Sequence, residues 1–515
     1  MSKKSKGNKG DLIYYEPLSS DCPTPSVFGE KRNKGPDYTK VYLKGGQGFI
    51  VGSEIESFPK NLVGIPQGKE GNILVVGANG SGKSRCIAKT TLLTWNGAMA
   101  VLDPKGELYA HYMELRKSGK VDREAILFDL TCDDGKCYDP LHGIIPGSVE
   151  EIECMKDIVR SICPTNTKCP DPFWDNAERN ILFASLLHYH GEGCNFIIII
   201  TKVLLSTIKQ LCKEINEGDT ELAKMYIQNL SKVDSKIRAS FSCGLLNALG
   251  DLVSNPYLLK AFCGDNEGSD HFGWANLEKY NIFIRVPEDK IEQWSIPIRI
   301  MFTQLFHYLM KRPDKYSDEG RKNIQTLLLL DDFARFGKIE LITEAITTLR
   351  SKNVNICIML QSLAQLDRIY GVDDRRIICD NCQFKVILSA YDGDTQKHLS
   401  ELIGSTVKWK EDYTDIEDTC GSIDSTSRHH SSHRVPVIYP HEFKTLNKVL
   451  FDTPHGFYCL DKITSEDIIS LQEFSIRPQE IDNNVTNYSS ARILSITSRN
   501  VDSTEIASNA EMTEK

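Results

Sequence analysis

Short, wholly apolar runs alternate with segments of helical periodicity along much of the chain. Residues 73–76 precede a helical pattern at 83–93, and residues 98–102 precede another at 107–116. Apolar runs of the same kind return later in the sequence, at 281–286, 326–330, 354–360 and 384–388. Strands that are apolar throughout and separated by helices form parallel sheets with helices on both faces. We therefore predict an α/β domain with a mostly parallel sheet.

Residues 148–275 have a different pattern, in which apolar residues recur at helical spacing and few segments resemble strands. A first apolar helical face is formed by Ile152, Met155, Ile158, Val159 and Ile162. A second is formed by Trp174, Ala177, Ile181 and Ala184, and a third candidate helix spans 234–252. Apolar residues three and four positions apart lie on one side of an amphipathic helix. We predict an all-α domain inserted into the α/β domain.

These patterns divide the chain into five segments. Residues 1–40 are rich in Lys, Gly, Ser and Pro, and residues 476–515 are rich in Asn, Ser and Thr. Both ends are expected to be flexible tails, because such compositions bury little apolar surface. The α/β domain is expected to comprise residues 41–147 and 276–475, and the all-α domain residues 148–275.

No segment has the length and apolarity of a membrane span, which needs roughly 18 or more apolar residues. The richest run, residues 196–205, is interrupted by Thr201 and Lys202, so we expect a buried core element there. The first ten residues contain lysines without an apolar stretch behind them, unlike a secretory signal. These features predict a cytoplasmic protein without a transmembrane segment.

The net charge of −9 argues against a protein that binds nucleic acid through a generally basic surface, although a local basic channel is compatible with it. The 16 cysteines are scattered, which favours reduced thiols in a cytoplasm over a disulfide framework.

The most specific motif is GANGSGKS at residues 77–84, which fits the P-loop pattern G-x-x-x-x-G-K-[ST]. It follows an apolar strand and begins a helix, which is the context that phosphate binding requires, because backbone N–H groups and the helix N-terminus attract anions. We expect Lys83 to contact the β- and γ-phosphates of ATP and the Ser84 hydroxyl to ligate Mg²⁺. The residues expected to bind the nucleotide are Gly77, Ala78, Asn79, Gly80, Ser81, Gly82, Lys83, Ser84 and Arg85.

Two carboxylates, Asp331 and Asp332, directly follow the apolar run at 326–330. A P-loop needs an acidic partner on a nearby strand to hold the metal, so we expect Asp331 to bind Mg²⁺ through water. Asp332 stands where an ATPase usually has the glutamate that polarises the attacking water. An aspartate is one methylene shorter, which reduces its reach by roughly 1.5 Å, and shifts of that size affect rates.

Polar residues also follow two other predicted strands. Gln361, after the run at 354–360, is expected to hydrogen-bond the γ-phosphate or the attacking water, with an ordinary strand-end amide as the alternative. Residues 103–107 (DPKGE) end the strand at 98–102. They either flank the nucleotide, since ligands of parallel sheets bind at the carboxyl edge, or form a plain turn and helix start.

Seven stretches match known motifs in order: GANGSGKSR, VLDPKGELY, CYDPL, DPFWDNAERNILFASLL, LLLLDDFARFGKIELITEAITTLRSKNVNICIMLQSLAQLDRIYG and the weaker YDGDTQKHLSELIGSTV and VIYPHEFKTLNKV. Together they resemble the TraG/TraD family of type IV secretion coupling proteins over about residues 60–460. The resemblance implies a RecA-like P-loop ATPase with an all-α insertion, assembled as a homo-hexamer. It also implies single-stranded DNA with its relaxase, or protein substrates, as cargo, and type IV secretion channel components as partners.

Carried over to this sequence, the resemblance assigns Lys83 and Ser84 to the P-loop, Asp331 to the metal and Gln361 to the strand-end glutamine. The family usually has glutamate where Asp332 stands, which bears on the hydrolysis rate. Its members typically begin with transmembrane helices, which this sequence lacks. We therefore expect a soluble member, a member docked to a membrane partner, or a shortened copy, at the inner face of the bacterial plasma membrane.

Ring ATPases often complete the site with an arginine from the next subunit. Arg350 is our candidate for this catalytic role, with Arg375 or Arg376 as alternatives. An exposed arginine without such a role is the other interpretation for each.

Three functions remain open from the sequence. The first is an ATP-hydrolysing coupling protein of conjugative transfer. The second is a receptor that binds ATP but hydrolyses little of it, as Asp332 suggests. The third is a double-stranded DNA translocase of the FtsK/HerA type.

Overall fold

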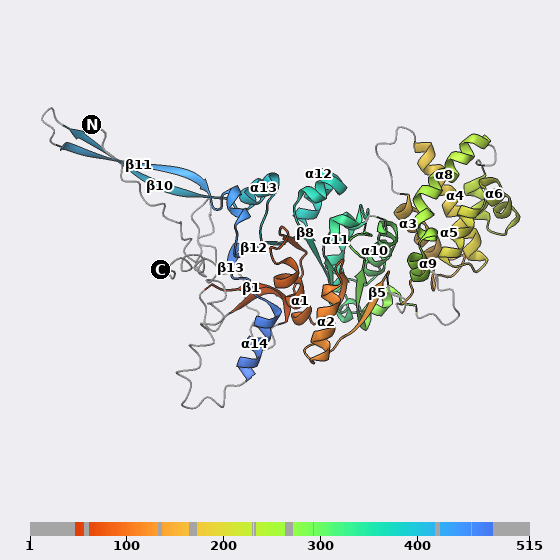
Figure 1. Ribbon diagram of the computed structural model, residues 1–515, viewed down its shortest axis with the longest axis horizontal. Helices are drawn as coiled ribbons and strands as arrows, with labels where there is room; N and C mark the ends of the chain where they lie inside the picture. Colours follow the sequence, from red (N-terminus) through yellow and green to blue (C-terminus); the bar gives the residue numbers. More distant parts are fainter. Residues whose placement is uncertain are drawn as a thin grey trace, which may run out of the picture.

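The computed structural model describes residues 47–476, apart from 56–60, 132–135, 164–171, 229, 231–232, 263–270, 292, 418–422 and 455. The two predicted tails, 1–40 and 476–515, lie outside the described residues except for position 476. A sheet with helices on both sides forms the middle of the molecule, a group of helices lies at one end, and a β-hairpin projects from the other (Figure 1).

The central sheet contains, within the described residues, nine strands in the order β13-β12-β9-β3-β8-β7-β4-β6-β5. Every pair from β9 to β5 is parallel, whereas β12 is antiparallel to both β9 and β13. The mostly parallel α/β sheet predicted from the apolar runs is therefore confirmed. The strands are β3 (Ile73–Val76), β4 (Ala98–Leu102), β5 (Glu124–Asp129), β6 (Tyr280–Arg285), β7 (Thr326–Leu330), β8 (Val354–Leu360), β9 (Phe384–Ile387), β12 (Val449–Thr453) and β13 (Gly456–Leu460).

Alternate residues of the strands enter two separate cores, because successive side chains of a strand point to opposite faces. On β3, Ile73 and Val75 pack with α1 and α2, whereas Leu74 and Val76 pack with the helices of the opposite face. Both sets are buried, which explains why these strands are apolar throughout. The covering helices are α1 (Lys89–Thr94), α2 (Glu107–Lys117) and α14 (Ser465–Ile476) on one face, and α10 (Ser295–Met310), α11 (Ile342–Thr348), α12 (Ala364–Asp380) and α13 (Gly393–Ile403) on the other.

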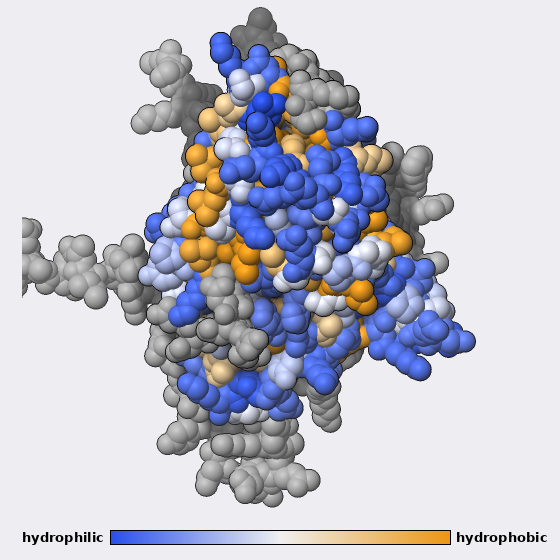
Figure 2. Space-filling model, turned by 90° about the vertical axis from the view of Figure 1, so that its right-hand side faces the viewer, coloured by the Kyte–Doolittle hydropathy of each residue, from blue (hydrophilic) through white to orange (hydrophobic). Residues whose placement is uncertain are grey.

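Within the described residues between β5 and β6, all named secondary-structure elements are helices, as the apolar spacing predicts. These helices gather at one end of the molecule (Figure 1). They are α3 (Val149–Ile162), α4 (Pro172–Gly191), α5 (Phe196–Leu205), α6 (Ile208–Glu217), α7 (Glu221–Ile227), α8 (Ser235–Ser254) and α9 (Pro256–Phe262). The face of the molecule at this end is largely hydrophilic with separate hydrophobic patches (Figure 2). The apolar run at 196–205 is the helix α5, and its Phe196, Ile199 and Ile200 are fully buried.

Two hairpins lie outside the sheet. The first joins β1 (Gly48–Ser53) and β2 (Leu62–Pro66), and Thr94 Oγ1 donates to the Gly48 carbonyl, which ties it to α1. The second joins β10 (Ser405–Glu417) and β11 (Ile423–Pro436) and projects from the body (Figure 1). None of the helices in the described ranges combines the length and the apolarity needed to cross a membrane.

Candidate nucleotide-binding site

The strand register brings the predicted polar residues to one edge of the sheet. Val76 of β3 is paired with Leu360 of β8, and Leu330 of β7 is paired with Leu102 of β4. Because these strands are parallel, the residues that follow them emerge at the carboxyl edge, where such sheets bind ligands. The residues are Gly77, Gln361, Asp331 and Asp103.

The P-loop is fixed by the two strands beside it. Gly77 N donates to the Leu360 carbonyl at 2.9 Å, and Ala78 N donates to Ser389 Oγ at 3.1 Å. Gly80 and Gly82 have φ of 75° and 104°, which side chains other than glycine rarely adopt. The loop therefore takes a shape that its glycines permit and its neighbours hold.

The loop is tightly packed and contains a hydrogen-bond donor without a partner, two features expected of a phosphate-binding loop. A Cβ at Gly77 would lie 2.4 Å from Ser81 Oγ and 3.1 Å from Leu388 Cβ and Lys83 Cγ, so a side chain there would displace the Ser81 hydroxyl. Ser81 Oγ is buried and has no hydrogen-bond partner among the described residues. After Gly82 the chain enters a π-helical turn, η1 (Lys83–Ala88), which continues into α1. Loop and helix start together provide the backbone N–H groups that bind phosphate oxygens.

Lys83 is buried at the centre of this site. Its Nζ donates to the Gly77 carbonyl at 2.6 Å, so the ammonium is held by the loop itself. Burial lowers the pKa of Lys83, the carboxylates of Asp332 and Asp331 oppose that shift, and the charge of Lys105 adds to it. The ammonium thus lies between the loop and the two carboxylates that end β7.

Asp331 and Asp332 form a buried acidic pair, 5 % and 6 % exposed. Burial and the charge of Asp332 raise the pKa of Asp331 to about 6, while Lys83 and Lys105 act in the opposite direction. A buried carboxylate with a raised pKa has too little positive charge nearby to stabilise its ionised form. A divalent cation supplies such charge. Asp331 therefore fits its expected role as a Mg²⁺ partner.

Asp332 is held in an unusual backbone conformation, with φ of 48°. Its N–H donates to Asp331 Oδ1 at 3.0 Å, and its Oδ1 accepts from Gln361 Nε2 at 3.2 Å. Arg335, in the short helix η5 (Phe333–Phe336), lies 3.8 Å from Asp332 Oδ2 and also contacts Glu288. Aspartate tolerates this left-handed conformation better than most residues, which gives a local reason for the shorter acid at this position.

The Ser84 hydroxyl, the second expected Mg²⁺ ligand, hydrogen-bonds to Glu107 at the start of α2. Glu107 also pairs with Lys89 at 3.1 Å. Although burial raises the pKa of Glu107, hydrogen bonds from Lys89 and Ser84 hold it below its usual range. Mg²⁺ usually binds one or two protein oxygens together with phosphates and water, which this small donor set fits. Among the described residues there is no cluster of three or more metal-binding side chains.

The segment 103–107 is a turn and helix start that also borders the site. Asp103 Oδ2 accepts from the N–H groups of Leu108 and Tyr109, both at 2.9 Å, which caps α2. Lys105 shifts the pKa values of Lys83 and Asp331, and Glu107 contacts Ser84. The segment therefore forms the expected turn and helix start, and its place beside the nucleotide stays a prediction.

Arg350 lies at the opposite edge of the sheet. It belongs to the short helix η6 (Leu349–Lys352) that precedes β8, and its Nε is 3.6 Å from Glu70, which precedes β3. Arg375 pairs with Asp367 at 2.7 Å, within α12. Arg376 is paired with Asp373 in the same helix. None of these ion pairs involves a P-loop residue, so an arginine from a neighbouring subunit stays a prediction.

Three contributors to the site were not identified in the sequence. Ser389 directly follows the apolar run at 384–388, so the rule that pointed to Gln361 could have found it. Arg335 lies three residues after Asp332, and the 3₁₀-helical turn η5 brings the two side chains together. Lys462 donates to the Ser81 carbonyl at 2.9 Å from 381 positions away, and no local pattern indicates that contact.

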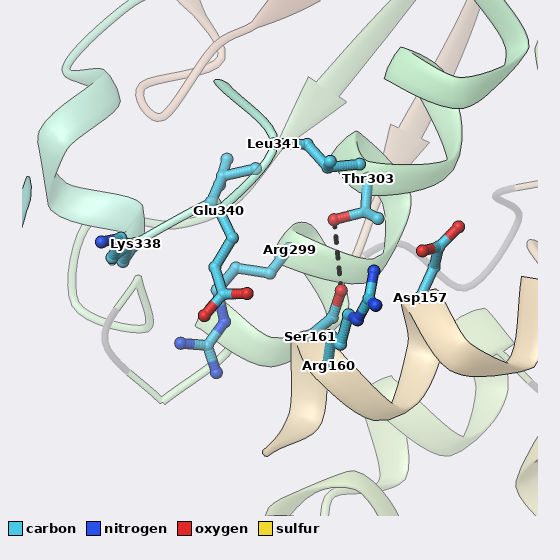
Figure 3. Close-up of a pocket in the computed structure, with 9 residues that line it drawn as sticks. Asp157, Arg160, Ser161, Arg299, Thr303, Lys338, Glu340 and Leu341 are labelled. Carbon is cyan, nitrogen blue, oxygen red and sulfur yellow. Dashed lines mark hydrogen bonds between the residues drawn. The ribbon is translucent and has the colours of Figure 1, made fainter. Parts of the chain in front are cut away.

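A small cavity of about 50 Å³ lies away from this site, between α3 and α10 and beside residues 338–341 (Figure 3). The Ser161 hydroxyl hydrogen-bonds to Thr303 there at 3.2 Å, across the two helices. Charged side chains line it, including Arg160, Arg299 and Glu340. It contains no P-loop residue and marks a polar junction between the helical segment and the sheet domain.

Comparisons with known proteins agree with this geometry. The family model described as "Type IV secretory system Conjugative DNA transfer" matches residues 60–450. Protein VirD4 of Agrobacterium fabrum is 25% identical over 349 residues, 66% of this chain and 50% of VirD4. A conjugal transfer protein TraG of Escherichia coli is 23% identical over 428 residues, 76% of this chain and 66% of TraG. The chain spans about half the length of the VirD4 relatives it matches.

Solved structures show the same fold. The plasmid coupling protein TrwB in complex with ADP and Mg²⁺ superimposes with a TM-score of 0.59 at 18% identity, covering 78% of this chain and 88% of TrwB. TrwB in complex with a non-hydrolysable ATP analogue gives the same TM-score of 0.59. The sheet domain is thus RecA-like, and from the match over residues 60–450 the chain belongs to the type IV secretory system conjugative DNA transfer family.

Proposed function

We propose that this protein is an ATP-hydrolysing coupling protein, which recruits DNA–relaxase or protein substrates and drives them into a type IV secretion channel. The observation that carries the proposal is the meeting of the P-loop, Asp331–Asp332 and Gln361 at one sheet edge in a member of the conjugative DNA transfer family. The TrwB complexes with ADP and Mg²⁺ and with an ATP analogue support nucleotide binding at this place.

In the proposed reaction the P-loop binds and orients the triphosphate. Lys83 exchanges its contact with the Gly77 carbonyl for the β- and γ-phosphates. Its buried position keeps water from weakening the interaction with charge that develops on the transferred phosphoryl group. Arg85, exposed at the start of the helix, extends the positive charge of the loop.

Ser84 and Asp331 hold Mg²⁺, which when bound neutralises phosphate charge. For Ser84 to do so, its hydroxyl turns away from Glu107. Asp332 accepts a proton from the attacking water, and Gln361, already hydrogen-bonded to Asp332, fixes the position of that water. Arg350 of a neighbouring subunit is the proposed source of additional positive charge.

The active assembly in this proposal is a homo-hexamer. Hydrolysis changes how neighbouring subunits face one another across the nucleotide and moves single-stranded DNA, or an attached protein, through a central channel. The working position is the cytoplasmic face of the inner membrane, with membrane contact through secretion channel partners. The RecA-like fold and the relatives VirD4 and TraG support this arrangement.

A second candidate is a receptor that binds ATP and hydrolyses little of it. The observation that favours it is the environment of Asp332, whose backbone is left-handed and whose carboxylate is held by a hydrogen bond from Gln361 and an ion pair with Arg335. Asp332→Glu discriminates the two, because it extends the carboxylate by roughly 1.5 Å. A gain in turnover of tenfold or more supports the weak hydrolase, whereas a loss supports an active site built around aspartate.

A third candidate is a double-stranded DNA translocase. Steady-state ATP hydrolysis with single-stranded and with double-stranded DNA of equal nucleotide concentration separates it from the first. Preferential stimulation by single-stranded DNA supports the coupling protein. Preferential stimulation by the duplex contradicts it and favours the translocase.

A further inference from the structure

Lys462 lies between β13 and α14 and reaches the P-loop from the far end of the sequence. Its Nζ donates to the Ser81 carbonyl at 2.9 Å. β13 runs in the same direction as β3, because β12 is antiparallel to both β9 and β13 and β9 is parallel to β3. Lys462 therefore emerges at the same carboxyl edge as the P-loop.

The backbone on both sides of Lys462 is anchored. Asp461 N donates to the Ser53 carbonyl at 2.8 Å, and Ser53 N donates to the Asp461 carbonyl at 3.0 Å. Ile463 is 1 % exposed and packs in the core on the α1 side of the sheet. This fixed base limits the positions of the half-buried ammonium, so its contact with the loop is a built feature of the fold.

The ammonium of Lys462 has no carboxylate within ion-pair distance in the described part of the chain. Lys448, at the same open end of the hairpin, pairs with Asp461 instead. Asp467 of α14 accepts hydrogen bonds from Thr464. Burial lowers the pKa of Lys462, as expected for a cation without a matching charge. Its charge is therefore directed to the Ser81 carbonyl rather than to a carboxylate.

The contact also orients one peptide group of the cradle. The Ser81 carbonyl and the Gly82 N–H belong to the same planar, trans peptide unit and point in opposite directions. By holding the carbonyl on one side, Lys462 directs the Gly82 N–H to the other. Backbone N–H groups at this position of a P-loop are the donors that bind phosphate.

We propose that Lys462 is a positioning residue of the nucleotide site, which holds the Ser81–Gly82 peptide in its phosphate-binding orientation. The inference rests on the proposed function, since it needs a nucleotide at the P-loop. Lys462 sets the affinity for nucleotide, whereas Lys83 acts on the phosphoryl group that is transferred.

The test compares Lys462→Met, which keeps the chain length and removes the charge, with Lys462→Arg, which keeps the charge. Lys117→Met is the control, because it removes the charge of an exposed lysine at the end of α2. The dissociation constant of ADP with Mg²⁺ is measured by calorimetry, so that the readout does not depend on turnover. KM and kcat for ATP are measured on the same proteins.

We expect Lys462→Met to weaken ADP binding by about ten- to hundredfold, the effect of losing one hydrogen bond to a charged group. KM rises by a similar factor and kcat stays within about threefold. Lys462→Arg restores most of the affinity, and Lys117→Met binds like the unaltered protein.

Affinity of Lys462→Met equal to that of the unaltered protein would overturn the inference and leave the proposed function intact. Equal weakening by Lys117→Met would also overturn it, because the effect would then be general electrostatics. Failure of the unaltered protein to bind ADP would overturn the inference and the proposed function together.

Discussion

Asparagine at position 332 separates the chemical role of Asp332 from its structural role. Asparagine has the same shape as aspartate and is also tolerated at a positive φ, so the backbone at φ 48° is kept. Its side-chain oxygen can still accept from Gln361. What the substitution removes is the negative charge and the ability to take a proton from water.

The expected loss follows from the proton transfer that Asp332 is proposed to carry out. A positioned general base contributes about 10²- to 10⁴-fold to rate, which corresponds to about 2.7 to 5.4 kcal/mol. We therefore expect Asp332→Asn to lower kcat for ATP by at least about hundredfold. Stability should change little, because removing the charge of Asp332 relieves its repulsion with Asp331 and also removes its attraction to the buried Lys83.

The assay is single-turnover hydrolysis of ATP, combined with calorimetric binding of ADP and thermal unfolding of the same samples. Asp373→Asn serves as the control, because Asp373 is an exposed acid on α12 with 95% of its side chain accessible. Turnover of Asp332→Asn within threefold of the unaltered protein would refute the assignment of Asp332 as the base. A comparable loss in Asp373→Asn would refute it as well.

Two further predictions concern the loop and the domain junction. Gly77→Ala should weaken ADP binding by about tenfold, because the new Cβ would lie 2.4 Å from Ser81 Oγ and overpacking of this kind costs roughly 1–3 kcal/mol. Calorimetric titration with ADP measures the effect. Unchanged affinity would contradict the loop conformation described above. His307→Gln should lower the melting temperature at pH 6 and change it little at pH 9. Asp157, 2.9 Å away, raises the pKa of His307 above its usual 6.5, so the pair stabilises the fold fully below pH 6.5 and loses that effect as the pH rises through the folded-state pKa. Equal effects at both pH values in thermal unfolding would contradict this.

The sequence predicted the centre of the sheet better than its margins. The runs at β3, β4, β7 and β8 match the predicted residues because both faces of these strands are buried, which requires apolar side chains throughout. The edge strand β5 was missed, although its residues 125–128 are apolar throughout, so the same rule could have found it. The antiparallel strands β12 and β13 were missed as well, because they form a hairpin without an intervening helix.

In the candidate site, too, residues of local motifs could be predicted and contacts that depend on packing could not. Lys83, Asp331, Asp332 and Gln361 could be predicted because each follows a recognisable strand or belongs to a local motif. The contact of Lys462 with Ser81 depends on how distant segments of the chain pack. The contact of Arg335 with Asp332 depends on the helical turn that follows β7. Arg350 lies at the amino edge of the sheet, beside Glu70. Its proposed catalytic role requires contact with the nucleotide of a neighbouring subunit.

The measurement that tests the central claim most directly is steady-state ATP hydrolysis, with and without single-stranded DNA, by the unaltered protein and by Lys83→Ala. Lys117→Ala is the matched control, since it removes an exposed lysine at the end of α2. The account predicts turnover that single-stranded DNA stimulates, that Lys117→Ala retains and that Lys83→Ala reduces by about hundred- to thousandfold, the effect of losing one donor that stabilises developing charge. Equal turnover in Lys83→Ala and the unaltered protein would contradict the site, and ATP binding without turnover would contradict the motor and favour the receptor.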